Sequence, residues 1–245
     1  MRTEGIVSAG YVIVRRAARP ADVDSSLLPG ELVSVSDSLA PVLPSVPPGW
    51  LEALDTPPGR FSGYADAAQG NLLWALEADL ARFGLDGTRS ASVCDWLGAA
   101  WAHGDFHPPS AFATPDAARR FARAFGPPPG DALLVGLGVR EEDVDAVADA
   151  DDSGTFVSRL TVCREPVADG GTVLGFDVYR VEDGELLTWV REQGADASLA
   201  AAGLRPNGHG LFASEDDAAR AAVQLAQDGG HWFALQLTEY PLRAA

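Results

Sequence analysis

Lysine is absent from the 245-residue sequence, and all 18 basic residues are arginine. They stand against 35 aspartates and glutamates, so the formal net charge is −17 at pH 7. A chain this poor in positive charge is badly suited to a phosphate backbone, and we expect no nucleic-acid partner. The missing lysine also excludes the P-loop, whose lysine reaches nucleotide phosphates. A large partner is therefore expected to be a neutral or basic protein.

Cysteine and long apolar runs are also scarce. No segment approaches the roughly 18 to 20 apolar residues of a membrane span, and residues 1–20 read as a strand rather than a signal peptide. The two cysteines, Cys94 and Cys163, lack C-x-x-C spacing. They are therefore interpreted as buried, reduced thiols in a cytoplasmic protein, with a nucleophile or a disulfide as the alternatives.

Hydrophobic residues make up 47% of the chain, enough for real cores, and their spacing predicts an α+β fold. β-Branched and aromatic runs predict strands, whereas capped runs with apolar side chains at helical spacing predict helices. The Asp183-Gly184 pair predicts a hairpin turn. The expected strands are 6–15, 31–36, 132–137, 155–163, 172–181, 186–190 and 232–240. The expected helices are 66–83, 195–202 and those opening at Thr114-Pro115 and Ser214, with 92–101 open between strand and helix.

Three segments interrupt the chain: a proline-rich loop at 41–59, a Gly-Pro stretch at 126–130, and an acidic segment at 141–154. We take 141–154 as the linker or boundary between an N-terminal module, 1–140, and a C-terminal module, 155–245. Each module is expected to be an antiparallel sheet covered by helices on one face. Charge divides unevenly, because 1–125 holds 10 arginines and 14 acids whereas 126–245 holds 8 and 21.

The two modules share a short sequence motif. Residues 112–122 align with 212–222 at six identities and one Thr/Ser exchange, and the expected closing strand begins 20 residues after the phenylalanine in both. This similarity predicts an internal duplication. The alternative is that F-A-[ST]-x-D merely marks a strand end that leads into a capped helix.

Metal-ligating side chains are densest at His103, Asp105 and His107. Two imidazoles and a carboxylate at alternate positions could hold Zn²⁺ or Fe²⁺. The alternative is a polar loop, since Gly104 and Pro108 disfavour a helix and no further ligand motif follows. We predict no other cofactor.

Other motifs are incomplete. Asp149 to Gly154 copies the start of a calcium loop, but Leu160 stands where the bidentate glutamate belongs. Gly136 and Gly138 resemble part of a dinucleotide fingerprint whose third glycine is replaced. His209, in a glycine-rich loop, is the best isolated candidate for a general base, although a loop histidine without a role is the simpler interpretation.

The hypothesis we favour is a non-catalytic, acidic, cytoplasmic binding protein, of the inhibitor or immunity type, that engages a basic protein partner. The alternative is a small-molecule enzyme using His103, Asp105 and His107, or His209, in a cleft between modules. A third hypothesis is an oligomeric scaffold with an exposed tryptophan face. The six tryptophans are otherwise expected in cores or module interfaces: Trp50, Trp74, Trp96, Trp101, Trp189 and Trp232.

Overall fold

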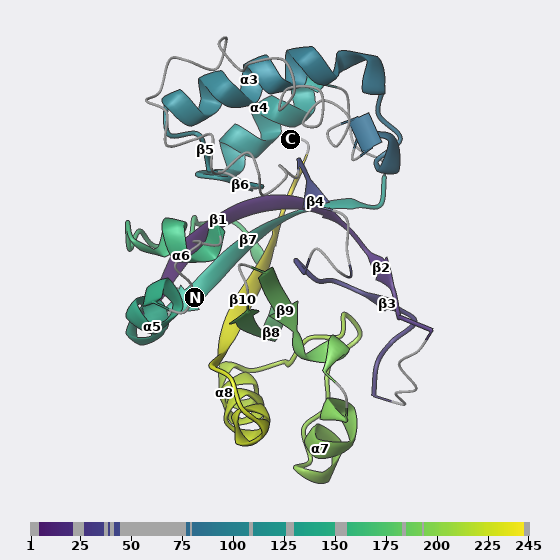
Figure 1. The fold of residues 1–245 in the computed structure, drawn as a ribbon, viewed down its shortest axis with the longest axis vertical. Helices are drawn as coiled ribbons and strands as arrows, with labels where there is room; N and C mark the ends of the chain where they lie inside the picture. Colours follow the sequence, from purple (N-terminus) through teal and green to yellow (C-terminus); the bar gives the residue numbers. More distant parts are fainter. Residues whose placement is uncertain are drawn as a thin grey trace.

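The computed structural model describes residues 5–21, 27–36, 39, 42–44, 77–78, 80–107, 110–125, 130–149, 156–182, 185–192 and 194–242. Within these ranges, strands from both ends of the chain form one eight-stranded antiparallel sheet (Figure 1). Its order is β5-β6-β1-β7-β10-β8-β9, and β4 also pairs with β1. The bounds are β1 (Ile6–Arg15), β4 (Val42–Leu43), β5 (Phe106–His107), β6 (Ala111–Phe112), β7 (Ala132–Arg140), β8 (Thr172–Glu182), β9 (Glu185–Thr188) and β10 (Trp232–Tyr240). A separate pair comprises β2 (Ala17–Ala18) and β3 (Glu31–Leu32).

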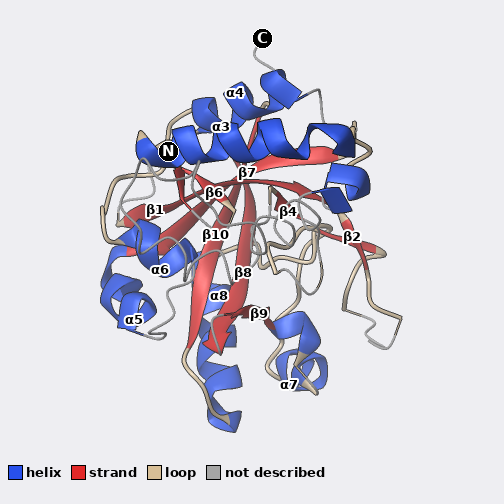
Figure 2. Ribbon diagram, turned by 45° about the horizontal axis from the view of Figure 1, so that its top comes forward, coloured by secondary structure: helices blue, strands red, loops and turns tan. Residues whose placement is uncertain are grey.

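Two pairs of helices cover one face of the sheet. α3 (Ser90–Ala102) and α4 (Pro115–Phe125) pack over the β1 side, whereas α7 (Ala195–Ala201) and α8 (Glu215–Leu225) pack over the β8 side. The two pairs lie at opposite ends of the molecule in Figure 1. The opposite face carries α6 (Phe156–Thr161), which packs on β1 and α5 (Val144–Asp149) (Figure 2). Single turns complete the fold: η2 (Gly87–Arg89), η3 (Glu141–Asp143), η4 (Trp189–Arg191) and η5 (Ala226–Asp228).

Side chains alternate between the faces of the central strands, which produces separate cores. Valines and leucines of β1, β7 and β10 fill the core under α5 and α6. Beneath α3 and α4 the core is aromatic, with the Phe121 ring 5.3 Å from Trp96 and 5.5 Å from Phe112. The core beneath α7 and α8 is built around Trp189 and Phe212, whose rings are 5.8 Å apart.

The two sides of the sheet are paired in matching registers. Adding 165 to a β1 residue and 100 to its β7 partner gives a β8–β10 pair: Tyr11–Gly136 corresponds to Phe176–Gln236. The β7–β10 ladder itself is symmetric about the Leu137–Leu237 pair.

The irregularities of the strands match as well. β1 and β8 both break register beside a glycine with positive φ, Gly10 at +98° and Gly175 at +148°. A carbonyl oxygen approaches each glycine closely, which favours a residue without a Cβ. The aromatic residue after each glycine pairs with a phenylalanine just before a helix. Tyr11 pairs with Phe112 before α4, and Phe176 pairs with Phe212 before α8.

The α+β prediction is confirmed, and the strand at 6–15 has the predicted bounds. Ser214 caps α8 by accepting a hydrogen bond from the Asp217 amide, as the sequence predicted. The division into modules 1–140 and 155–245 stays a prediction, and residues 150–155 of its boundary lie outside the described residues. The expected strand at 31–36 is shorter, since only β3 pairs there.

Residues 155–163 were expected to form a strand, and this prediction is wrong because residues 156–161 form α6. Val157, Leu160 and Thr161 are buried at helical spacing, and packing on β1 outweighs the strand preference of the β-branched Val157 and Thr161. Cys163 follows the helix and is exposed, which corrects its prediction as a buried thiol. Residues 92–101, for which the sequence left strand and helix as alternatives, are helical and lie within α3. No helix among the described residues is long and apolar enough to cross a bilayer.

Candidate functional site

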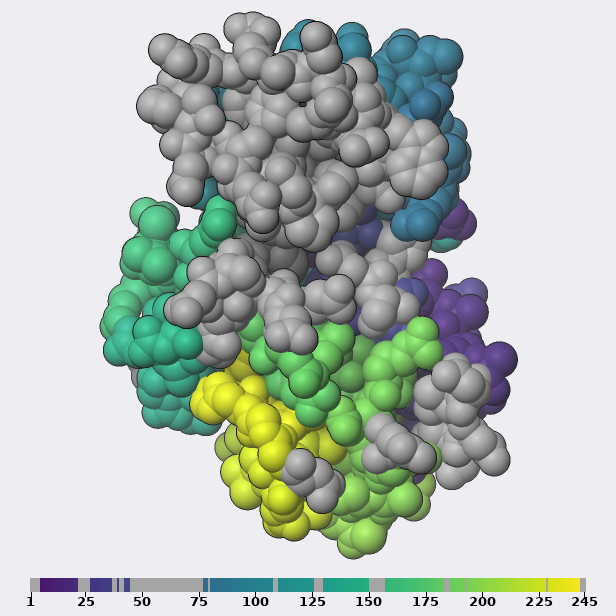
Figure 3. All heavy atoms as spheres, viewed as in Figure 1, coloured from purple at the N-terminus to yellow at the C-terminus, as the bar shows by residue number. Residues whose placement is uncertain are grey.

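Acidic side chains from two distant parts of the chain meet where β7 ends. β7 leads directly into η3 and α5, and the first turn of α8 lies beside them, with Arg140 Nε 2.8 Å from Glu215 Oε1. In Figure 3 the teal atoms of α5 lie beside the yellow atoms of the C-terminal helix and strand. We call this surface the acidic cluster and define it by Glu141, Glu142, Asp143, Asp145, Asp149, Glu215, Asp216 and Asp217.

Local sequence explains why α8 accepts so many acids at one end. The Ser214 hydroxyl satisfies the Asp217 amide, and the three acids of the first turn lie near the positive end of the helix dipole. η3 has no such cap, since Arg140 makes no side-chain capping bond to it, although Asp145 lies in the first turn of α5. Helix stability therefore accounts for only part of the cluster.

Among the residues that the structure describes, three arginines contact the acidic cluster. Arg140 pairs with Glu142 as well as Glu215, Arg164 pairs with Asp145, and Arg220 pairs with Asp217 at 3.0 Å. Eight carboxylates against three guanidinium groups leave an excess of five negative charges. Exposed ion pairs contribute only about 0–1 kcal/mol each, so they do not explain this concentration of charge as a stabilising network.

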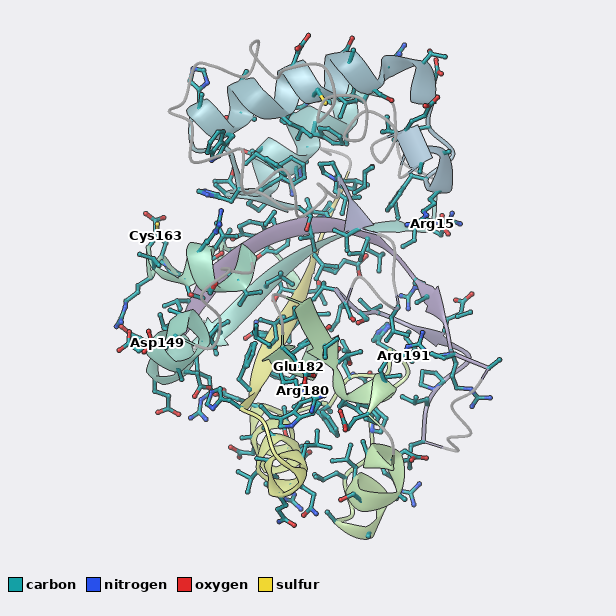
Figure 4. The ribbon with its side chains drawn as sticks, in the orientation of Figure 1. Arg15, Asp149, Cys163, Arg180, Glu182 and Arg191 are labelled. Carbon is teal, nitrogen blue, oxygen red and sulfur yellow. The ribbon has the colours of Figure 1, made fainter. Side chains whose placement is uncertain are left out.

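Most of the acidic cluster is accessible. Asp149, at the end of α5, lies at the edge of the molecule (Figure 4). A shallow hollow of about 420 Å³ lies between Gly5, Arg140 and the acids of η3 and α8. Asp143 is half-buried, and burial raises the pKa of its carboxyl although Arg140 opposes the shift. The exposed members are Glu141, Glu142, Asp145, Asp149 and Asp216.

The predicted metal ligands have other partners. His103 Nδ1 lies 2.6 Å from the Ala99 carbonyl, and Asp105 pairs with Arg120 at 2.7 Å. His107 is half-buried, and burial lowers the pKa of its imidazole. Among the residues that the structure describes, no three His, Cys, Asp or Glu side chains are grouped so that they could hold a metal. The metal site stays a prediction.

His209 lies in the loop that supports residues 31–36. Its carbonyl accepts a hydrogen bond from the Val33 amide, and its own amide donates to Asn207 Oδ1. Arg16 Nη1 lies 3.2 Å from His209 Nδ1. Because a guanidinium can only donate, this ring nitrogen is the acceptor and its lone pair is engaged. Its proposed role as a general base stays a prediction.

The remaining sequence candidates are placed as follows. Trp189 and Trp232 are buried, Trp96 and Trp101 are partly buried, and the other two tryptophans lie outside the described residues. Most of the proline-rich loop and of the calcium-like loop also lies outside them. Both cysteines are free, and burial raises the pKa of the Cys94 thiol to about 11, which makes it a poor nucleophile.

Sequence reasoning missed a buried polar group in β8. Asp177 is only 2% exposed, and its Oδ1 accepts from the Val178 amide at 2.8 Å and from the Thr188 hydroxyl at 3.4 Å. Burial raises the pKa of this carboxyl to about 7. Tyr179, on the same strand face, receives a hydrogen bond from the Val35 amide. The sequence signal that could have predicted this buried group is an aspartate in the middle of an apolar strand.

Comparisons with known proteins add no functional assignment. The sequence matches no protein-family model, and no curated protein or solved structure is similar to it.

Proposed function

We propose that this chain is a non-catalytic, cytoplasmic binding protein that engages a basic protein partner through the acidic cluster. One observation carries the proposal: among the described residues, η3 and α5 on one side and the start of α8 on the other carry eight carboxylates, the two segments are joined by the Arg140–Glu215 pair, and three arginines pair with these acids. An inhibitor or immunity-type protein is the kind of binding protein that this charge distribution suits. The two free cysteines are consistent with a reducing compartment.

Charge of one sign acts chiefly on the rate of encounter. A patch with an excess of negative charge attracts a basic surface over about 10 Å at 0.1 M salt. Such steering raises association rates from about 10⁵–10⁶ M⁻¹s⁻¹ toward 10⁸ M⁻¹s⁻¹ or more at low salt. The exposed acids of the cluster are surrounded by water until the partner docks, so dissolved ions screen their attraction at a distance. Binding should therefore weaken strongly as salt is added.

We also propose that the chain arose by duplication of a strand–helix–strand unit. The sequence motif at 112–122 and 212–222 supports this origin, and so do the constant offsets of 165 and 100 that relate the two ladders. The matching positive-φ glycines, Gly10 and Gly175, support it further, since chance does not favour the same irregularity at equivalent positions. Within the acidic cluster, Glu215, Asp216 and Asp217 lie inside the second copy of the motif, 212–222, whereas η3 and α5 follow β7 and lie outside both copies.

The test is affinity capture from the native host by the wild-type chain and by a cluster variant, Glu141→Gln/Glu142→Gln/Asp216→Asn. We expect the wild type to retain a basic protein at low salt and to release it at high salt, and the cluster variant to retain at least about tenfold less. The retained protein is identified and then measured against both chains as a purified species.

A control variant separates the acidic cluster from net charge. Asp95→Asn/Asp116→Asn/Glu182→Gln removes the same three charges from exposed positions outside the cluster. It should retain the partner as well as the wild type does. Equal losses in both variants, or the absence of any salt-sensitive basic protein, would contradict the proposal.

A further inference from the structure

A cleft of about 380 Å³ opens on the sheet face between the two helix pairs. Its floor is formed by Ile6, Val173, Gln236 and Thr238, which lie on three strands of the sheet. Residues 166–171 form its wall. This volume falls within the roughly 300–1,000 Å³ that is usual for small-molecule sites.

The wall of the cleft is anchored on both sides. The Ala168 amide donates to the Tyr11 hydroxyl at 2.8 Å, and the Tyr240 hydroxyl donates to the Ala168 carbonyl at 2.5 Å. The Ser8 amide donates to the Glu165 carbonyl at 2.6 Å just before the wall begins. These bonds hold the wall against β1 and β10. The cleft is therefore preformed, which reduces the ordering cost of binding.

Gln236, which lines the floor, carries an unsatisfied polar atom. The residue is 3% exposed, and its Nε2 donates to Thr238 Oγ1 at 3.0 Å. Its Oε1 is buried and has no hydrogen-bond partner in the described part of the chain. Leaving a buried acceptor unpaired is costly. An apolar residue would therefore be more stable at position 236 if the side chain had no binding role.

The two polar side chains together define the complementary ligand. Gln236 Oε1 requires a donor, and the Thr238 hydroxyl, which already accepts one hydrogen bond, retains its own proton to donate. A group with an N–H beside a carbonyl matches both. Gln236 and Thr238 are neutral, so an ion buried against this floor would lack an opposite charge, and Asp169 in the exposed wall further disfavours an anion. We propose that this cleft binds a small neutral molecule with a cyclic amide edge, in which the N–H faces Gln236 and the carbonyl faces Thr238.

The probe is 2-pyrrolidinone, a cyclic amide that carries this edge, titrated into the full chain and followed by NMR at the side-chain amide of Gln236. N-methyl-2-pyrrolidinone is the matched control because it has the same ring and carbonyl but no N–H. We expect saturable shifts with 2-pyrrolidinone and at least tenfold weaker binding of the methylated ring. Equal binding of the two, or no shift at Gln236, would overturn the proposal.

Two variants test the assignment of the cleft. Gln236→Leu/Thr238→Val removes both polar groups and should abolish binding while leaving the denaturation midpoint unchanged or higher, since no unpaired amide is then buried. Val173→Trp fills the cleft from a position that is 50% exposed, so it should fold and lose binding even if the double variant does not fold. Gln224→Leu, on α8 and paired with Ser198, is the control that should bind normally. Unchanged binding in Val173→Trp would refute this location.

The cleft and the acidic cluster are independent in these tests. The cluster variant Glu141→Gln/Glu142→Gln/Asp216→Asn should bind 2-pyrrolidinone as the wild type does. Gln236→Leu/Thr238→Val should still capture the basic protein. Failure of one proposal therefore leaves the other standing.

Discussion

Asp177 lies in β8 with almost no exposed surface, and burial raises the pKa of its carboxyl from 3.8 to about 7. Between these two values the folded chain keeps a proton that the unfolded chain has lost. Unfolding therefore releases a proton, and stability falls as the pH rises through this window. At about 1.4 kcal/mol per pKa unit, the loss from below pH 4 to above pH 7 is about 4 kcal/mol.

The substitution Asp177→Asn removes this titration while keeping a side chain of the same shape. Its carbonyl oxygen can still accept from the Val178 amide, as the carboxyl does. We expect the stability difference between variant and wild type to shift in favour of the variant by about 4 kcal/mol as the pH rises from about 4 to 8. Urea unfolding of both chains at a series of pH values measures this difference in unfolding free energy. Contributions from groups that titrate equally in the two chains cancel in it.

Asp95→Asn, at an exposed position of α3, is the control and should follow the wild-type pH dependence. If Asp177→Asn also follows the wild-type curve, the carboxyl is not held protonated by burial. The reasoning from burial to stability would then be refuted.

Two further predictions concern packing and backbone conformation. Phe121→Ala should cost about 3–5 kcal/mol in urea unfolding because the ring is fully buried, whereas Val223→Ala, at a position 70% exposed, should stay within about 0.5 kcal/mol. Gly175→Ala should destabilise by about 1–3 kcal/mol, since φ is +148° and a Cβ would lie 2.7 Å from the Phe212 carbonyl oxygen. Gly130→Ala, with open space around its Cβ position, should be tolerated, and equal effects at the two glycines would contradict the geometry.

Local signals predicted much of the fold. The apolar run at 6–15 formed a strand with the expected bounds, and Ser214 with its following acids marked the start of α8. Both signals act between near neighbours in the chain. The helix α6 was missed because its valine and its threonine favour strands, and only the packing of its buried side on β1 reveals its conformation.

The sequence did not predict how strands distant in the chain pair with one another. Nothing in the residues of β7 and β10 indicates that Leu137 would face Leu237, because many registers would bury such strands equally well. The acidic cluster was predicted only as a boundary segment, since its second half comes from α8, about 70 residues later in the chain. The cleft at Gln236 carries no local pattern at all. Gln236 and Thr238 lie two residues apart on β10, but the wall comes to lie beside them only when the sheet has formed.

The central claim is that the acidic cluster attracts a basic partner. The most direct measurement is the association rate of the captured partner with the wild type and with Glu141→Gln/Glu142→Gln/Asp216→Asn, at a series of salt concentrations. We predict that the wild-type rate falls steeply with salt, that the cluster variant starts lower with a shallower dependence, and that the two converge at high salt. Parallel salt dependences at a constant ratio of rates would contradict the claim.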